Sequence, residues 1–245
     1  MHPIAQLFIT CLIDSLFPHV GEAVVEVLRR AGTQVAFPSG QTCCGQPAYN
    51  AGFHEQAVRM AQSTIDVFSG TLGPIVVPSG SCAAMLRYGY QELFAEDPIW
   101  LPRARALARR VFEFSEFLVD ELSVIDLGAE CNESLAYHPS CHLLRDLGVD
   151  RQPMALLYAV KGLEVYRLGS ECCGFGGVFS VDHAQISAQM LDRKLSEIKR
   201  SNTSRVVACD VSCLMQLEGG LRREDSQVRG AHLAQILAGE GGGLQ

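Results

Sequence analysis

Long apolar runs are missing from this sequence. None of its apolar stretches approaches the roughly 18 to 20 residues that a helix needs to span a bilayer. The opening MHPIAQLFITCLIDSLFP lacks the basic start of a secretory signal, and it carries Asp14. We therefore expect no transmembrane segment and a cytoplasmic location, where cysteines serve as metal ligands or redox groups more often than as disulfides.

An excess of positive charge is missing as well. The 245 residues carry a formal net charge of −7, which argues against a nucleic acid as a partner. The glycines of Gly174-Phe175-Gly176-Gly177 do not have the G-x-G-x-x-G spacing of a dinucleotide-binding loop. Because no flavin or nicotinamide motif and no carboxylate clamp stands out, the sequence does not predict a complete dehydrogenase on this chain alone.

Cysteine, by contrast, is abundant, and the ten cysteines form a repeat. Two triplets, Cys43-Cys44-Gly45 and Cys172-Cys173-Gly174, lie 129 residues apart. In each copy a lone cysteine precedes the pair by 31 or 32 positions, and another follows it by 38 or 40. The two sets are Cys11, Cys43, Cys44 and Cys82, and Cys141, Cys172, Cys173 and Cys213. Such a duplicated arrangement indicates two sets of metal ligands.

The flanking sequence repeats in the same order as the cysteines. Each copy has an apolar strand before the first cysteine, then a helix and a second strand, a further helix after the pair, and a third strand before the last cysteine. These segments are 4–10 and 134–140, 24–35 and 155–165, 55–68 and 184–198, and 74–77 and 205–208. We predict an α/β fold of two pseudo-symmetric repeats, each a small parallel sheet covered by helices.

The spacing of the copies divides the chain into three parts. We expect a first cysteine-rich repeat over 1–90, a helical linker over 91–132 and a second cysteine-rich repeat over 133–245. Mixed charges in the linker predict a solvated helix face rather than an anion site. The charged residues are Arg103, Arg105, Arg109, Arg110, Glu113, Glu116, Asp120 and Glu121.

The lone cysteines of both sets follow predicted strands and precede helices. Because the carboxyl ends of parallel strands meet at one edge of a sheet, the cysteines should gather there, with the two edges facing a common cleft. Helix N-termini favour thiolates and anionic clusters, and nearby glycines let backbone N–H groups approach sulfur. The candidate caps are Ser79, Ser81 and Ser212, and the glycines are Gly45, Gly80, Gly174, Gly176 and Gly177.

Four cysteines per copy match the ligand count of a four-iron cluster and also that of a structural zinc ion. Structural zinc sites usually take their cysteines from two short C-x₂₋₄-C pairs, whereas here two candidates are neighbours and the others are distant. The pattern favours iron–sulfur clusters, one or two per chain, with zinc in one set as the alternative. A vicinal disulfide would be strained and would leave the outer cysteines unexplained.

Six segments carry a resemblance to a known family. They are CLIDSLFPHVGEAVVEVL from Cys11, FPSGQTCCGQPAYNAGF from Phe37, VPSGSCAAM from Val77, YHPSCHLLRDLG from Tyr137, ECCGFGGVFSV from Glu171 and CDVSCLMQLEGGL from Cys209. Over nearly its whole length the sequence resembles the cysteine-rich CCG-domain iron–sulfur proteins, and among them the lactate-utilisation group. The wider family includes iron–sulfur subunits of glycolate oxidase and of anaerobic glycerol-3-phosphate dehydrogenase, and the B subunit of heterodisulfide reductase.

The resemblance implies an electron-transfer subunit with 4Fe-4S clusters in an L-lactate-oxidising complex. Its expected partners are a ferredoxin-like iron–sulfur subunit and a third small subunit. Two other functions stay open, a catalytic cluster of the heterodisulfide reductase type and a structural zinc protein. Metal identity separates the zinc protein from the other two, and activity of the isolated chain with lactate separates those from each other.

One departure from the family pattern concerns the last cysteine of each copy. Heterodisulfide reductase B subunits have a C-x-x-C pair there, which gives five cysteines and a noncubane cluster. This sequence has Ser79 and Asp210 where the extra cysteine would stand. Four cysteines fit a cubane cluster, with Asp210 or its neighbour Cys209 as an additional ligand of the second set. Otherwise Cys209 is a buried strand cysteine, and Cys131 is a thiol outside both sets.

Two histidines flank the first cysteine of the second set. His138 and His142 are candidate catalytic residues for proton transfer during oxidation of a hydroxy acid. The alternative is a hydrogen bond from either ring to cluster sulfur or to a helix end. His54, His183 and His232 are predicted to be surface or packing residues.

Overall fold

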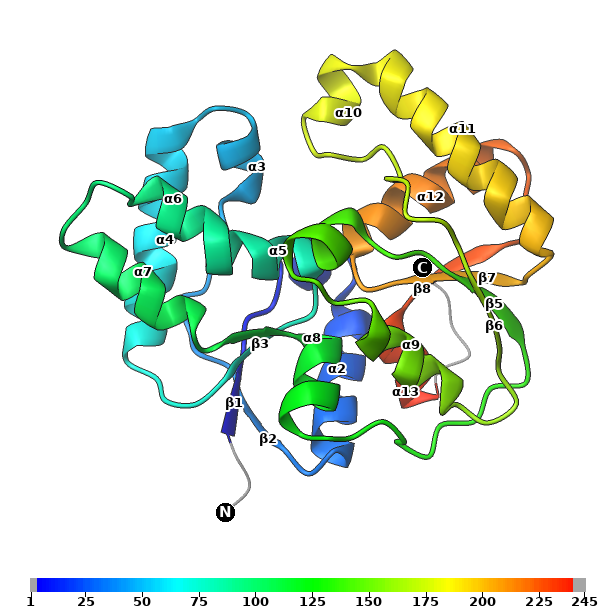
Figure 1. Cartoon of the computed structure of the whole chain (residues 1–245), viewed down its shortest axis with the longest axis horizontal. Helices are drawn as coiled ribbons and strands as arrows, with labels where there is room; N and C mark the ends of the chain where they lie inside the picture. The colour runs from blue at the N-terminus through cyan, green and yellow to red at the C-terminus, as the bar shows by residue number, and fades with distance from the viewer. Residues whose placement is uncertain (1–3, 240–245) are drawn as a thin grey trace.

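The computed structural model describes residues 4–239, and within this range it contains two parallel sheets of four strands each (Figure 1). The first sheet has the order β2-β1-β3-β4, and the second has the order β6-β5-β7-β8. The strands are β1 (Ile4–Leu7), β2 (Gln34–Ala36), β3 (Ile75–Val77), β4 (Val111–Glu113), β5 (Ser134–Tyr137), β6 (Glu164–Arg167), β7 (Arg205–Ala208) and β8 (Arg229–His232). The predicted α/β fold of two parallel-sheet repeats is confirmed.

The first three strands of each half lie where the sequence places them, but β4 and β8 were not predicted. Each of these adds a parallel strand beside β3 or β7. Strand β4 falls within 91–132, so this segment is not purely helical as expected. The boundaries of the three predicted parts stay a prediction.

Helices occupy most of the remaining described chain. In the first half they are α1 (Cys11–Leu16), α2 (Pro18–Arg30), α3 (Gln46–Asn50), α4 (His54–Ser69), α5 (Gly80–Ala84), η1 (Met85–Gly89) and α6 (Tyr90–Leu93). Next come α7 (Trp100–Ala108), α8 (Phe114–Glu116) and η2 (Phe117–Glu121). The second half has η3 (His142–Asp146), α9 (Arg151–Tyr158), α10 (Phe179–Asp182), α11 (Ala184–Ser201), α12 (Val211–Arg223) and α13 (Leu233–Ala238). The η elements are π-helical turns.

The helices form three layers around the two sheets (Figure 1). Helices α4, α6 and α7 lie on the outer side of the first sheet, and α11 and α12 lie on the outer side of the second. Between the sheets, α2, α9 and α13 share one apolar core. Arg30 at the end of α2 donates hydrogen bonds to the carbonyls of Leu237 and Ala238, at 3.0 and 3.1 Å. The last described helix is thereby fixed to the first half.

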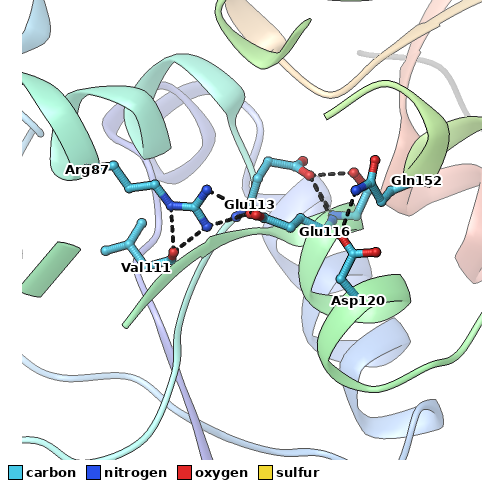
Figure 2. Close-up of polar contacts among 7 residues, drawn as sticks. Arg87, Val111, Glu113, Glu116, Asp120 and Gln152 are labelled. Carbon is cyan, nitrogen blue, oxygen red and sulfur yellow. Dashed lines mark hydrogen bonds and ion pairs between the residues drawn. The ribbon is translucent and has the colours of Figure 1, made fainter. Parts of the chain in front are cut away.

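A polar network fixes the segment that connects the halves (Figure 2). Arg87 donates to the backbone carbonyl of Val111 and forms an ion pair with Glu116 at 2.6 Å, with both side chains largely buried. On the other side of the segment, Gln152 of the second half donates to Asp120 at 2.6 Å. Because these bonds run to both halves, the segment ties the two repeats together.

The acidic residues of this segment do not share one solvated helix face, and that prediction is wrong for Glu113. This residue ends β4, is fully buried and caps α8 in a capping box with Glu116. Burial raises the pKa of the Glu113 carboxyl to about 8, because its hydrogen bonds from Ser115 and the backbone offset only part of the desolvation.

Among the described residues, no helix has the length and apolarity to cross a membrane.

Candidate metal centre

All eight cysteines of the two sets line a single cavity of about 410 Å³ between the halves. Helix α3 of the first half and α10 of the second lie on opposite sides of it (Figure 1). The common cleft expected from the two sheet edges is therefore present. Burial within the sets is matched as well, since the last two cysteines of each set are buried and the first two are half-buried.

The lone cysteines are positioned by helix starts directly after strands. Cys11 begins α1, whose N-cap Thr10 accepts a hydrogen bond from the backbone N–H of Ile13. Ser79 caps α5 and accepts from the N–H of Cys82 at 3.2 Å, as predicted. The predicted caps Ser81 and Ser212 are wrong, because both lie inside their helices. The sequence analysis missed Thr10, although a threonine before a predicted helix is an N-cap signal.

Sulfur atoms are in contact within each set. The Cys44 thiol donates to Cys82 with Sγ atoms 3.4 Å apart, and the Cys141 thiol donates to Cys172 at 3.8 Å. Cys173 and Cys213 bring their sulfurs within 4.8 Å of each other. All ten cysteines are free thiols in the structure. The two sets predicted from spacing therefore each converge in space.

The pKa pattern repeats between the sets. Hydrogen bonds from Cys11 and then Cys44 lower the pKa of Cys43, while the same bonds raise the pKa of their donors. In the second set, bonds from Cys141 and then Cys173 lower the pKa of Cys172. The first cysteine of each adjacent pair is therefore the readiest thiolate of its set.

A second thiol of the second set, that of Cys213, also has a lowered pKa. A hydrogen bond from Cys173, and after it the imidazole of His138, lowers the pKa of the Cys213 thiol to about 6 although the residue is buried.

Glycine makes the turn after each adjacent cysteine pair possible. Gly45 and Gly174 both have positive φ angles, of 84° and 88°. The N–H of Gly174 donates to the Sγ of Cys172 with a separation of 3.4 Å, as expected for a backbone donor to sulfur. A Cβ on Gly174 would lie 2.6 Å from the carbonyl oxygen of Ser187, so that backbone approach requires glycine.

Ser79 and Asp210, which stand where a fifth cysteine would be, bind each other across the two halves. One oxygen of the buried Asp210 carboxylate accepts from Ser79 Oγ at 2.6 Å, Ser81 Oγ at 2.9 Å and Ser81 N at 3.2 Å. Its other oxygen has no hydrogen-bond partner among the described residues. Asp210 lines the cavity, and its role as an additional ligand stays a prediction.

The remaining candidates separate by position. Cys209 is buried in contact with the hydroxyl of Tyr137 at 3.9 Å and is not among the residues lining the cavity, while Cys131 lies outside both sets. His142 lines the cavity and pairs with Asp146. His138 is fully buried beside Cys173 and Cys213. Proton transfer by either histidine stays a prediction.

Three further histidines match their expected roles. His54 and His183 are exposed. His232 is buried, caps α13 and bonds to the backbone carbonyl of Cys209 at 3.1 Å. Burial lowers the pKa of His232 to about 4, so its ring stays neutral.

The donor sets fit a metal or iron–sulfur centre. Zinc held by four thiolates at about 2.3 Å keeps its sulfurs about 3.8 Å apart, which is the Cys141 to Cys172 separation. A four-iron cluster would take one thiolate per iron and so requires a wider spacing than that of these sulfurs. The cavity is far larger than the roughly 10–15 Å³ that one water molecule needs, so it has room for more than a single ion.

Comparison with known sequences agrees with this geometry. The profile of the cysteine-rich CCG domain matches residues 5–87 and 135–218, which contain both sets. The chain belongs to the cysteine-rich CCG domain family. The two matches of this CCG chain coincide with its two sheets, apart from the fourth strands β4 and β8, which lie outside the matched ranges.

Relatives of this CCG protein match it almost from end to end. Lactate utilization protein A of Exiguobacterium sp. is 44% identical over 238 residues, which cover 96% of this chain and 97% of the relative. Lactate utilization protein A of Shouchella clausii is 46% identical over 234 residues, which cover 95% and 97%. Among solved structures, glutamate racemase RacE1 of Bacillus anthracis aligns with 97% of this chain and 79% of its own at 14% identity and a TM-score of 0.40, too distant to bear on function.

Proposed function

We propose that this protein is an iron–sulfur electron-transfer subunit of a lactate-utilisation system. The observation that carries the proposal is the convergence of two sets of four cysteines on one cavity. Cys11, Cys43, Cys44 and Cys82 would hold one centre, and Cys141, Cys172, Cys173 and Cys213 the other. Bound clusters would supply one-electron redox chemistry. The names of the two relatives, which match over nearly their full length, support lactate utilisation as the context.

The residues of this chain position the cysteine sulfurs and stabilise negative charge on them. Thr10 and Ser79 fix the helix starts that carry Cys11 and Cys82. Backbone N–H groups near the pairs, such as that of Gly174, stabilise negative charge on sulfur. Two cysteines of each set are buried and two are half-buried, and all eight line the cavity.

Substrate oxidation on this chain alone is disfavoured by the cavity lining. Lactate carries a carboxylate, which proteins usually hold with arginine or lysine. Neither arginine nor lysine is among the described residues that line the cavity, and Asp210 adds negative charge there. We therefore assign lactate oxidation to a partner or a shared interface. The proposed partners are a ferredoxin-like iron–sulfur subunit and a third small subunit.

Zinc is the second candidate, and one observation favours it. The Cys141 to Cys172 sulfur separation of 3.8 Å is that of two thiolates on one zinc ion, although the Cys44 to Cys82 separation of 3.4 Å is shorter. Zinc in one or both sets would make the protein a structural component rather than a redox subunit. A catalytic centre of the heterodisulfide reductase type has less support, because Ser79 and Asp210 replace the extra cysteines and bind each other.

Metal analysis of protein purified without oxygen tests the proposal. We expect about four to eight irons per chain with matching acid-labile sulfide, and an EPR spectrum that changes on reduction with dithionite. Cys43→Ser and Cys172→Ser change the same place in the two sets, so each should lose one centre. Cys131→Ser, outside both sets, should lose neither. Stoichiometric zinc without sulfide would overturn the redox function.

The lactate context has its own test. A strain without this chain should lose growth on L-lactate, and wild-type protein should restore it. A chain with both Cys43→Ser and Cys172→Ser should not. Restoration by the double variant would separate the cysteine sets from lactate utilisation.

A further inference from the structure

The two cysteine sets differ at one buried position that follows the central strand of each sheet. Phe8 follows β1, and its N–H donates to the carbonyl of Val76 at 3.0 Å. His138 follows β5, and its N–H donates to the carbonyl of Val207 at 2.7 Å. Both residues lie three positions before the first cysteine of their set. They occupy equivalent places, with an apolar ring in one half and an imidazole in the other.

The imidazole of His138 has unused bonding capacity. The residue is fully buried, and neither Nδ1 nor Nε2 has a hydrogen-bond partner of normal geometry among the described residues. Buried polar side chains are nearly always bonded, and neutral imidazole is the commonest metal ligand in proteins. The ring is poorly placed to exchange protons with a molecule in the cavity, because His138 is not among the residues that line the cavity. His142 does line it.

The ring also has the right neighbours. One nitrogen of His138 and the sulfurs of Cys173 and Cys213 all lie within 4.8 Å of one another. Some point must then lie within about 2.8 Å of all three atoms, and metal bonds to imidazole and thiolate are about 2.0–2.3 Å long. A contraction of about half an ångström would complete three bonds to a single ion, whereas in a cluster each of the three ligands would bind a different iron at a wider spacing. All three residues are buried and come from different strand ends or loops.

We propose that His138 is a nitrogen ligand of the second metal centre, together with Cys173 and Cys213. This inference rests on the proposed metal binding and adds its donor set. One of Cys141 and Cys172, which are half-buried and 3.8 Å apart, supplies the fourth ligand, so that His138 takes the place of one cysteine of the set. The first centre, with Phe8 in the equivalent place, is held by cysteine alone. The two centres are therefore chemically different, with less negative ligand charge on the second.

Pulsed EPR on reduced protein carrying ¹⁵N only in histidine tests this ligand. The wild type should show the strong nitrogen coupling of a metal-bound imidazole. His138→Phe, which copies the first half, should abolish this coupling, and His142→Gln should leave it intact. A wild-type spectrum with no histidine coupling, or only the weak coupling of a hydrogen-bonded ring, overturns the proposal even if no variant folds. His138→Cys, which supplies a thiolate in place of the imidazole, should bind as much metal as the wild type and should lower the reduction potential of the second centre.

Whether His138 is a metal ligand can also be tested if the bound metal is zinc. Failure of the proposed redox function can therefore be distinguished from failure of the proposed histidine ligand. X-ray absorption at the zinc edge should then show a nitrogen shell at about 2.0–2.1 Å besides sulfur at about 2.3 Å. His138→Phe should remove the nitrogen shell while His142→Gln keeps it. An all-sulfur environment in the wild type overturns the ligand assignment.

Discussion

Asp210 joins the two halves through a single carboxylate oxygen. Ser79 and Ser81 of the first half donate three hydrogen bonds to it, and all of these groups are buried or partly buried. Hydrogen bonds to charged groups contribute about 1.5–3 kcal/mol each at most. Since Asp210 and Ser79 precede the last cysteines of both sets by three positions, this junction also fixes the ligands relative to each other.

Removing that carboxylate should destabilise the protein. We expect Asp210→Ala to lower the free energy of unfolding by about 2–3 kcal/mol, because it leaves the serine donors unpaired. Asp210→Asn should cost less, since its amide oxygen can still accept. Urea unfolding measures both. Asp192→Ala, at an exposed position of α11, is the control and should stay within about 0.5 kcal/mol of the wild type. Equal values for Asp210→Ala and the control would contradict this role.

Glu113 should make stability depend on pH. Its folded pKa of about 8 exceeds the usual 4.5, so between these values the folded state holds a proton that the unfolded chain has released. The free energy of unfolding therefore falls as pH rises through this window, by at most about 1.4 kcal/mol per pH unit, and this contribution levels off above pH 8. Asp210, whose charge also acts on Glu113, adds to the effect.

Glu113→Gln tests that dependence. The amide keeps an acceptor for the N–H groups of Ser115 and Glu116 but cannot ionise. We expect the slope of unfolding free energy against pH, measured by urea titrations between pH 5 and 8, to be flatter than in the wild type. Glu96→Gln, which is exposed, should keep the wild-type slope. An unchanged slope in Glu113→Gln would show that the proton is bound elsewhere.

At the scale of elements, the turns after the cysteine pairs are unequal despite their common sequence. A Cβ on Gly174 would lie 2.6 Å from the backbone oxygen of Ser187, whereas one on Gly45 would meet the Met60 side chain at 3.3 Å. Both positions have positive φ, which costs alanine about 1 kcal/mol or more. The backbone clash adds to that cost only in the second half.

We therefore expect Gly174→Ala to lose the metal of the second centre and Gly45→Ala to keep more of the first. Metal content per chain, measured after anaerobic purification, reports both effects. Circular dichroism confirms that each variant is folded. Equal losses in the two variants would mean that the φ angle alone sets the tolerance of these turns.

The elements that could be predicted are those with a strong local pattern. Strand β7 (Arg205–Ala208) and helix α4 (His54–Ser69) follow apolar runs or helical periodicity, and the structure places them within a residue or two of the expected segments. Strands β4 and β8 were not predicted from the sequence because they are short, and β8 has the sequence RGAH, which has little apolar character. Their pairing with β3 and β7 defines them, and this tertiary information is absent from a local window.

The candidate site was predictable to a similar degree. Cysteine spacing alone grouped the two sets, since ligands at strand ends of a parallel sheet must meet at one edge. Spacing could not reveal that Asp210 would bind Ser79, because this contact depends on how the halves dock. Nor could it show that Glu113 is buried, although the Glu113-x-x-Glu116 pattern is a capping-box signal.

At the scale of the molecule, the halves share one core. Residues of β1 and α2 from the first half pack in the same apolar cluster as residues of β5, α9 and α13 from the second. Leu237 of α13 is 1% exposed within this cluster. We therefore expect the two repeats to unfold together rather than as independent domains.

The single tryptophan makes this testable. Trp100 belongs to the first half, where it stacks on Phe94, so its fluorescence reports unfolding there. Leu237→Ala should lower the free energy of unfolding by about 2–4 kcal/mol and shift the Trp100 transition along with the circular dichroism transition. Leu72→Ala, at a side chain that is 87% exposed, is the matched control. If Leu237→Ala left the Trp100 fluorescence transition unchanged, the halves would unfold separately.

The position of α13 also bears on how the protein is made. Helix α2 leaves the ribosome well before α13, but the apolar surface that it shares with α13 is covered only after residues 233–238 have been synthesised. A nascent chain that has completed the first four cysteines therefore still lacks part of the core that holds their half together. We expect metal insertion to follow the synthesis of α13, for the first set as well as for the second.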